Sequence, residues 1–406
     1  MEERIPLNRL VLLCAALSVA TAACESKKEP VQAATQEAAA DAAPAKPDAP
    51  TRLAPPPGEP GPILIRLENN FPTQIFAAAA SPETIAFAMQ SDARDASLCT
   101  ATGLQICFRG YGVIVERKNP NQPHIVPLYE SDTQSGSRVD DVAAVGNAFV
   151  FSINEGRYVG DDHTATLLVA NAQGEAVQTV PLSKAGFLVT RTTLNTWDAQ
   201  QALVCTSFEP QQGKPGIQCQ LYRPSDGQFA AAGTISTQMP VRTFEVGVAN
   251  RRAIVVWIEG GYAKAAFLDS PGVVAELGAA SVVTPFIATG LKDFAVSWMG
   301  DDAQMHVDGI PAAGDLKALE RRTMTLNGLD HQNISGLVPL SEGYLLSFRY
   351  RNTPQLALID PAFTGWFLLE DNESWRILFD YGVFDIQDAH TGKILWQTAE
   401  SLVVKK

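Results

Sequence analysis

The sequence predicts an all-β fold built from repeated four-stranded units, and three observations carry that prediction. Residues 242–277 contain four apolar runs rich in Val, Ile, Phe and Ala, separated by turn residues. The stretch before them repeats the pattern, because Arg191-Thr192 stand 51 residues ahead of Arg242-Thr243. Tight turns also recur seven times between apolar runs. Four short strands per repeat, without helices, indicate a β-propeller of seven blades, each with four antiparallel strands.

Residues 1–23 have the layout of a secretory signal peptide, because a short stretch with two arginines precedes an apolar run that is too short to span a bilayer. The run ends in TAAC at residues 21–24, which resembles a bacterial lipobox. The resemblance implies that Cys24 is lipidated and anchors the protein at the bacterial cell envelope. Glu25 after this cysteine favours the outer membrane. In the alternative, ordinary cleavage after Ala22 leaves Cys24 as a plain thiol.

Residues 24–61 have a different composition, in which Ala, Pro, Glu and Lys alternate without a hydrophobic period. Such a segment cannot bury a core, so we expect a disordered tether with an end-to-end distance of roughly 35 Å. The propeller domain then comprises residues 62–406.

Within that domain, each recurrent turn is expected to join the two outer strands of a blade, with Gly supplying a positive φ. The turns occupy residues 119–122, 171–174, 225–227, 270–272, 312–314, 363–365 and 390–392. The last unit has only three apolar runs, residues 375–380, 383–388 and 393–398. We expect residues 63–68 to supply its missing strand and close the ring, which removes both exposed edges. Six blades with an irregular closure are the alternative.

Three bulky aromatic residues, Trp257, Trp298 and Phe348, occupy one position of the repeat. Residues that recur with the blade are expected to pack between blades rather than to stack on a ligand. The last hairpin, DAHTGKILW at residues 388–396, resembles the repeat of quinoprotein-like propellers. In that family the turn leads into a strand that closes on Trp, so the resemblance implies a propeller fold and no cofactor.

Cysteine usage agrees with an oxidising compartment. Beyond the signal peptide and Cys24, four cysteines remain, an even number. We expect two local disulfides, Cys99 with Cys107 across a short turn and Cys205 with Cys219 between successive strands. A zinc site is the rival interpretation, but neither spacing is CxxC and no histidine lies beside either pair.

The formal net charge of −13 limits the partners. Phosphate binding needs a basic surface, so the composition argues against nucleic acid. It also argues against adhesion of the folded domain to anionic lipid. We therefore expect contact with the membrane through the lipid anchor only.

Catalytic signatures are scarce. The sequence has no GxSxG, HExxH, P-loop or twelve-residue calcium loop. The metal-ligand candidates are weak, and a solvated turn is the alternative interpretation of them. They are Asp301, Asp302, His306 and Asp308.

The heads of three successive innermost strands carry arginines, Arg138, Arg191 and Arg242. In a propeller these positions can converge at one mouth of the central channel, where guanidinium groups could hold an anionic ligand. In the alternative, neighbouring carboxylates such as Asp140 and Asp141 neutralise them.

These observations predict a monomeric cell-envelope lipoprotein whose propeller is a non-catalytic binding or scaffolding module for a protein or envelope polymer. The alternative is an extracytoplasmic hydrolase or lyase acting on a glycan or lactone. That activity would need carboxylates or a histidine to converge at the channel mouth, and the candidates are Asp140, Asp141, His163, Asp301, His306 and Asp308.

Overall fold

The structure is a computed structural model. It describes residues 73–93, 107–116, 118–132, 137–155, 164–182, 187–210, 213–290, 293–314, 316, 322–326, 331–340, 343–350, 353–359, 362–363, 366–369, 375–380, 383–388 and 394–397. All of them belong to the unit Pro50–Lys406. The predicted signal peptide, tether and closing strand (residues 1–23, 24–61 and 63–68) lie outside the described residues. No helix in the described part is long and apolar enough to cross a membrane.

The described residues form seven antiparallel sheets, six with four strands and one with three, each pairing in chain order. The strands are β1 (Thr73–Ala80), β2 (Thr84–Ala93), β3 (Cys107–Glu116), β4 (Asn119–Asp132), β5 (Arg138–Val145), β6 (Ala148–Glu155), β7 (Thr164–Asn171), β8 (Ala176–Pro181), β9 (Phe187–Thr196), β10 (Ala202–Pro210), β11 (Gly216–Arg223), β12 (Gln228–Ser236), β13 (Phe244–Ala249), β14 (Arg252–Glu259), β15 (Tyr262–Phe267), β16 (Val274–Ala279), β17 (Phe286–Thr289), β18 (Asp293–Met299), β19 (Met305–Pro311), β20 (Arg322–Leu326), β21 (His331–Leu340), β22 (Gly343–Tyr350), β23 (Thr353–Ile359), β24 (Trp366–Leu369), β25 (Trp375–Asp380), β26 (Val383–Asp388) and β27 (Ile394–Gln397). The predicted all-β propeller of four-stranded antiparallel blades is confirmed.

The sheet β13–β16 shows how the sequence produces one blade. Its four strands are the four apolar runs of residues 242–277, and the first two turns between them have a left-handed backbone. Asn250 and Arg251 have φ of 51° and 60°, and Gly260 and Gly261 have φ of 62° and 83°. Two consecutive residues with positive φ match the twist of a two-residue hairpin. The predicted meander therefore holds at each of these turns.

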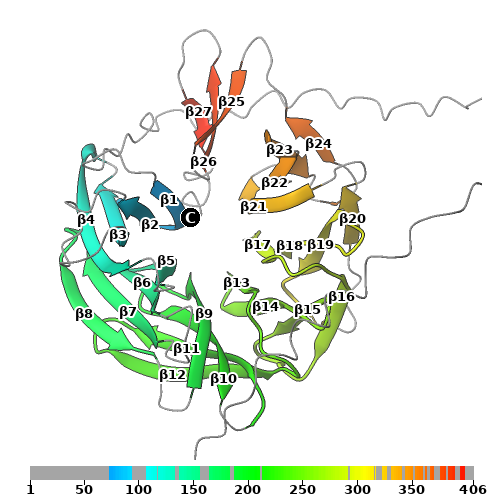
Figure 1. Cartoon of the computed structure of the whole chain (residues 1–406), viewed down its shortest axis with the longest axis horizontal. Helices are drawn as coiled ribbons and strands as arrows, with labels where there is room; N and C mark the ends of the chain where they lie inside the picture. Colours follow the sequence, from blue (N-terminus) through cyan, green and yellow to red (C-terminus); the bar gives the residue numbers. More distant parts are fainter. Residues whose placement is uncertain are drawn as a thin grey trace, which may run out of the picture. The chain divides into compact units, whose positions relative to one another are not determined.

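The first strand of each four-stranded sheet lies innermost (Figure 1). These inner strands contact one another in succession, β1 with β5, β5 with β9, β9 with β13, β13 with β17, and β17 with β21. Residues on the inner strands of neighbouring sheets can therefore meet.

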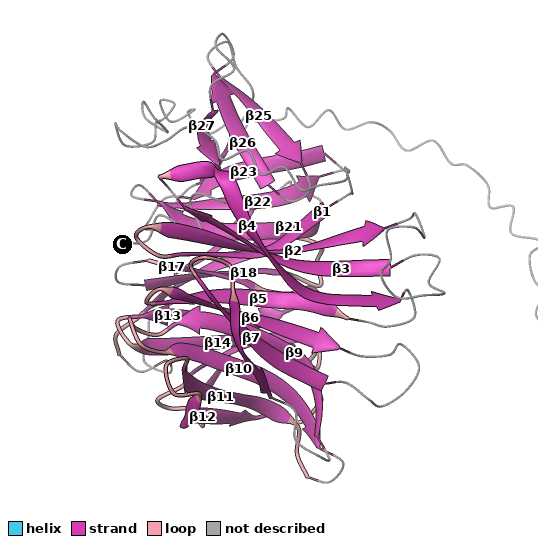
Figure 2. Ribbon diagram, turned by 90° about the vertical axis from the view of Figure 1, so that its left-hand side faces the viewer, coloured by secondary structure: helices cyan, strands magenta, loops and turns pink. Residues whose placement is uncertain are grey.

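The meander also sorts the loops into two faces. Because the strands of each four-stranded sheet alternate in direction, its loops alternate between two ends. The hairpin between the second and third strands is at one end, together with the connections to the neighbouring sheets. We call this side the connector face, and the opposite side, with the first and third hairpins, the hairpin face. Figure 2 shows loops at both ends of the strands.

Large aromatic side chains fill the space between sheets. Trp257 packs with Leu203 and Phe244, between the sheets β9–β12 and β13–β16. Trp298 packs with Ile254 and Phe294, between β13–β16 and β17–β20. Both indoles are almost fully buried, so the prediction of packing between blades is confirmed for them. The side chain of Phe348 lies outside the described residues.

One predicted turn was misplaced. Residues 119–122 belong to β4, which pairs with β3 from Asn119 opposite Glu116 onward. The Asn-Pro-Asn sequence suggested a turn, but Pro120 can sit in β4 because this strand is the outer edge of its sheet, where no partner needs its N–H. The turns at residues 171–174, 225–227, 270–272 and 312–314 lie between the strands that they were predicted to join. Gly174, Gly227 and Gly314 have the predicted positive φ, whereas Gly272 does not. Residues 364–365 and 390–392 of the last two turns lie outside the described residues.

The predicted disulfide between Cys205 and Cys219 is present, joining β10 to β11. The two residues lie directly opposite each other in the strand register and are fully buried. The predicted Cys99–Cys107 disulfide depends on Cys99 and on the side chain of Cys107, and both lie outside the described part of the structure.

Candidate functional site

Charged side chains gather on the inner strands β5, β9 and β13. We call this group the axial network, and it consists of Arg138, Asp140, Asp141, Arg191 and Glu245. The sequence analysis singled out all of them except Glu245, which was missed because it lies inside a run otherwise classified as an apolar strand.

A β-bulge explains how two consecutive aspartates face the same neighbour. The pairing of β5 with β6 shifts register between Val139 and Asp141, and a bulge turns adjacent side chains toward one side. The Asp140 carboxylate accepts a hydrogen bond from the Thr192 N–H (2.9 Å), and the Asp141 carboxylate accepts one from the Leu194 N–H (2.7 Å). Both N–H groups belong to β9, so the aspartates join two sheets.

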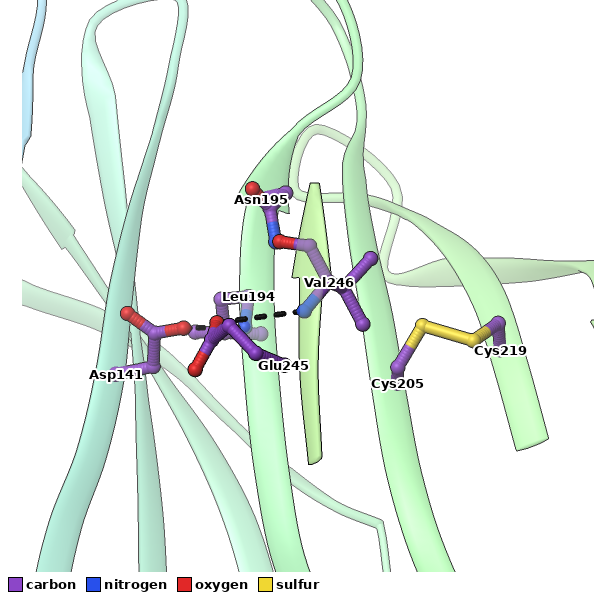
Figure 3. The surroundings of a disulfide bond; sticks show 7 residues. All are labelled: Asp141, Leu194, Asn195, Cys205, Cys219, Glu245 and Val246. Carbon is purple, nitrogen blue, oxygen red and sulfur yellow. Dashed lines mark hydrogen bonds between the residues drawn. A yellow bond between two sulfur atoms is a disulfide. The ribbon is translucent and has the colours of Figure 1, made fainter. Parts of the chain in front are cut away.

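A side chain also joins the next pair of sheets, but as a donor to a backbone carbonyl. The Asn195 side-chain amide on β9 donates to the carbonyl of Val246 on β13 (3.0 Å). Figure 3 shows Asn195 beside Val246, and its dashed lines mark the bonds of Asp141 with the Leu194 N–H and of Glu245 with the Val246 N–H. In the opposite direction, the Thr196 hydroxyl donates to the Ala144 carbonyl of β5 (2.7 Å). Side chains thus provide for the inner strands the hydrogen bonds that a further strand would provide in a continuous sheet.

Two carboxyl groups of the axial network, those of Asp141 and Glu245, have raised pKa values. Burial raises the pKa of Asp141 well above its usual value, and the charge of Glu245 adds to the rise. Burial also raises the pKa of Glu245, although the Arg191 guanidinium opposes it. Both residues are only partly exposed to solvent. Two carboxyl groups with raised pKa values around one arginine are a feature that functional sites share with structural networks.

The three predicted ligand-facing arginines differ in their contacts. Arg138 bonds to Asp140 through Nε (2.5 Å) and to the Thr190 carbonyl (2.9 Å). Arg191 bonds to Glu245 (3.2 Å) and lies within β9 rather than at its head, because β9 begins four residues earlier. Arg242 lies before β13, in the connection from β12, and is exposed. The structure thus pairs two of the three arginines with carboxylates.

The metal-ligand candidates do not form one group. Asp302 meets His306 (Oδ1 to Nε2, 3.2 Å), and the other ring nitrogen of His306 lies 3.1 Å from the Thr325 hydroxyl. Asp308 is buried and accepts a hydrogen bond from Thr323, whereas Asp301 is exposed. No group of three or more His, Cys, Asp or Glu side chains that could hold a metal ion occurs in the described part of the chain. His163 lies outside it.

A second candidate region lies on the connector face of the sheets β9 to β20. Three large apolar side chains are exposed there, Met239 (54%), Tyr262 (42%) and Val282 (77%). Sequence reasoning missed them, although bulky apolar residues in the connections between sheets were a usable signal. With exposed charged residues of these and the adjacent loops they form what we call the connector arc. The arc consists of Lys214, Met239, Arg242, Tyr262, Val282, Asp301 and Asp302.

Backbone N–H groups join the loops of the connector arc in a fixed order. Four hydrogen bonds do so: Thr237 N–H to the Pro215 carbonyl (3.0 Å), Met239 N–H to the Glu259 carboxylate (3.0 Å), Ala280 N–H to the Gly261 carbonyl (2.8 Å) and Ser281 N–H to the Met299 carbonyl (2.9 Å). The loops therefore lie side by side from the β10–β11 hairpin to the β18–β19 hairpin.

Comparison with known proteins bears on the fold alone. No family model matches the chain, and no curated protein matches it with significance. Among solved structures, a periplasmic gluconolactonase of Pseudomonas aeruginosa is 12% identical, with a TM-score of 0.48 over 77% of this chain and 87% of that one. The β-propeller domain of the Trilobed protease from Pyrococcus furiosus is 10% identical, with a TM-score of 0.44 over 81% and 93%.

A sialidase of Trypanosoma rangeli in complex with sialic acid is also similar, at 10% identity and a TM-score of 0.44. The match covers 70% of this chain and 53% of the sialidase, so the present chain spans about half the length of that protein.

Proposed function

We propose that this protein is a cell-envelope lipoprotein whose β-propeller is a non-catalytic binding module, and that the connector arc is its contact surface for a protein partner. The observation that carries the proposal is the grouping of Met239, Tyr262 and Val282 on one face. Exposed apolar side chains that cluster, with charged residues around them, are typical of protein interaction sites.

The contacts of the axial network support a structural role for the groups that a catalyst would otherwise use. The carboxylate oxygens of Asp140 and Asp141 accept hydrogen bonds from backbone N–H groups of β5 and β9. A general base must be free to take a proton from a substrate, so groups held in this way favour a scaffold.

Two features support the envelope location. The Cys205–Cys219 disulfide is of the kind that forms in oxidising compartments. The lipobox-like sequence at residues 21–24 provides the anchor, through lipidation of Cys24.

The binding proposal is tested by site-specific photocrosslinking in the producing cells. A photoreactive amino acid replaces Val282 in one variant and Val177 in the other. Val177 is a matched control, because it is an exposed valine (58%) on the outer strand β8, away from the connector arc. We expect a discrete protein adduct from position 282 and none from position 177. The absence of an adduct from position 282 would contradict the proposal.

The raised pKa values of Asp141 and Glu245 favour a second candidate function, hydrolase or lyase activity on a glycan or lactone. If the protein is such an enzyme, we expect turnover by the wild type and a turnover rate at least a hundredfold lower in the Asp141→Asn and Glu245→Gln variants. If it is a non-catalytic binding module, we expect no turnover by the wild type or by either variant. Assays on a panel of lactones and glycans separate the two.

A further inference from the structure

The charges of the connector arc are arranged in order. Lys214 and Arg242 stand toward one end, on the hairpin of the sheet β9–β12 and on the connection that leaves it. Asp301 and Asp302 stand at the other end, on the β18–β19 hairpin. The exposed side chains of Tyr262 and Val282 lie on the loops between these ends, and Met239 lies on the same connection as Arg242. The arc therefore runs from basic through apolar to acidic.

The charges at the acidic end are well defined. Asp302 accepts a hydrogen bond from the Gln304 N–H (3.0 Å), and this bond, with His306, lowers the pKa of its carboxyl. The carboxylate is thus ionised at neutral pH. The intervening Glu259 is already paired with Lys264 (2.9 Å) and adds no net charge to the middle of the arc.

A surface with this order is complementary to itself. Rotation by 180° about an axis through its apolar centre brings the basic end of one copy onto the acidic end of the other and apolar onto apolar. Two such ion-pair contacts form by symmetry. Any other partner would need the same charge order on its own surface, whereas a second copy has it by construction.

We propose that the partner of the connector arc is a second copy of this chain, held in a two-fold symmetric dimer. The inference rests on the proposed binding function of the same surface, and it departs from the monomer that the sequence led us to expect. A stable dimer buries roughly 800 Å² per copy, so the loop backbones between the named residues contribute contact area as well.

The test is sedimentation equilibrium of the full chain carrying Cys24→Ser, so that no lipid is attached to that residue. We expect twice the mass of one chain, with association weakened at least tenfold by Val282→Asp and unaffected by the matched surface change Val177→Asp. A single-chain mass at every concentration would overturn the proposal, and so would equal effects of the two valine substitutions.

Charge exchange provides a second measurement that does not depend on any single variant. Lys214→Glu/Arg242→Glu makes both ends of the arc acidic, and Asp301→Lys/Asp302→Lys makes both ends basic. We expect each variant alone to be monomeric and an equimolar mixture of the two to form a dimer, because each end then meets its opposite. If the mixture stays monomeric while both variants give the far-UV circular dichroism of the wild type, the dimer is wrong.

The outcomes also separate this inference from the proposed function. A crosslinked adduct between position 282 and a different protein, together with a monomeric chain, would overturn the dimer and leave the binding module in place. No adduct and no dimer would remove both.

Discussion

The axial network and the connector arc use their side chains in opposite ways. In the axial network, charged groups that look catalytic in the sequence turn toward the neighbouring inner strand and bond to its backbone. In the connector arc, apolar groups that look like ordinary core residues turn outward. The comparison teaches that residue type predicted the role poorly in both regions, because the role depends on where a strand or loop places the side chain.

The largest expected effect concerns the sheet that supports both regions. Replacing Cys205 and Cys219 together by alanine removes a bond that closes a loop of sequence separation 14. We expect the free energy of unfolding to fall by about 3 kcal/mol, measured by urea denaturation. Amide hydrogen exchange measures where the stability is lost. A loss of protection restricted to β9–β12 and their neighbours would show that the sheets unfold separately. An unchanged unfolding free energy would contradict the structural role of the bond.

The next effect tests whether the axial network stabilises the fold. Asp141→Ala leaves the N–H groups of Val142 and Leu194 without their acceptor, so we expect a loss of about 2 kcal/mol in unfolding free energy. The relief of repulsion with Glu245 is included in that figure. The matched substitution on the connector arc, Val282→Asp, should change the free energy of unfolding by no more than about 0.5 kcal/mol because the side chain is exposed. Similar losses for both substitutions would remove the distinction between the regions.

The smallest effect is a dependence on pH. The raised pKa values of Asp141 and Glu245 mean that the folded state binds protons more tightly than the unfolded state. Their contribution to stability is therefore present at acidic pH and is lost as the pH rises from the unfolded pKa values toward the folded ones. We expect a flatter pH profile of the unfolding free energy in Asp141→Asn/Glu245→Gln than in the wild type.

Asp226 provides the control of opposite sign. The N–H of Gln228 and the side chain of Arg223 lower the pKa of this exposed carboxyl. Its contribution is present above the unfolded pKa and is lost as the pH falls. Asp226→Asn should therefore change the acidic limb of the pH profile of the unfolding free energy in the direction opposite to that of Asp141→Asn/Glu245→Gln. A parallel change in the two sets of variants would show that the shifts are misassigned.

Much of the fold could be predicted because its strands and turns depend on residues that are close together in the sequence. The four runs of residues 242–277, the three runs of the last sheet and the positive-φ turns depend only on apolar periodicity and on Gly or Asn. The Cys205–Cys219 disulfide followed from two cysteines on successive strands. Packing of Trp257 and Trp298 followed from their recurrence at one repeat position.

The candidate sites could not be predicted in the same way, because they depend on contacts between sheets. The bulge at Val139 and Asp141 has no clear signature in the sequence, yet it decides that Asp140 and Asp141 both reach β9. The length of β9 places Arg191 within the strand and beside Glu245. Likewise, the order of charges in the connector arc appears only when the hairpins β10–β11 and β18–β19 are placed on the same face.

The bulge in β5 also has a consequence for how such a protein can evolve. Proteins made of repeats can grow or rearrange by duplicating a unit, provided that every junction between units accepts every other unit. The two aspartates of β5 match the N–H groups of Thr192 and Leu194, whereas the junction from β9 to β13 uses Asn195 and a carbonyl. Blades joined by such different bonds are no longer interchangeable, so a duplicated or shuffled copy of β5–β8 would need new partners before it could be retained.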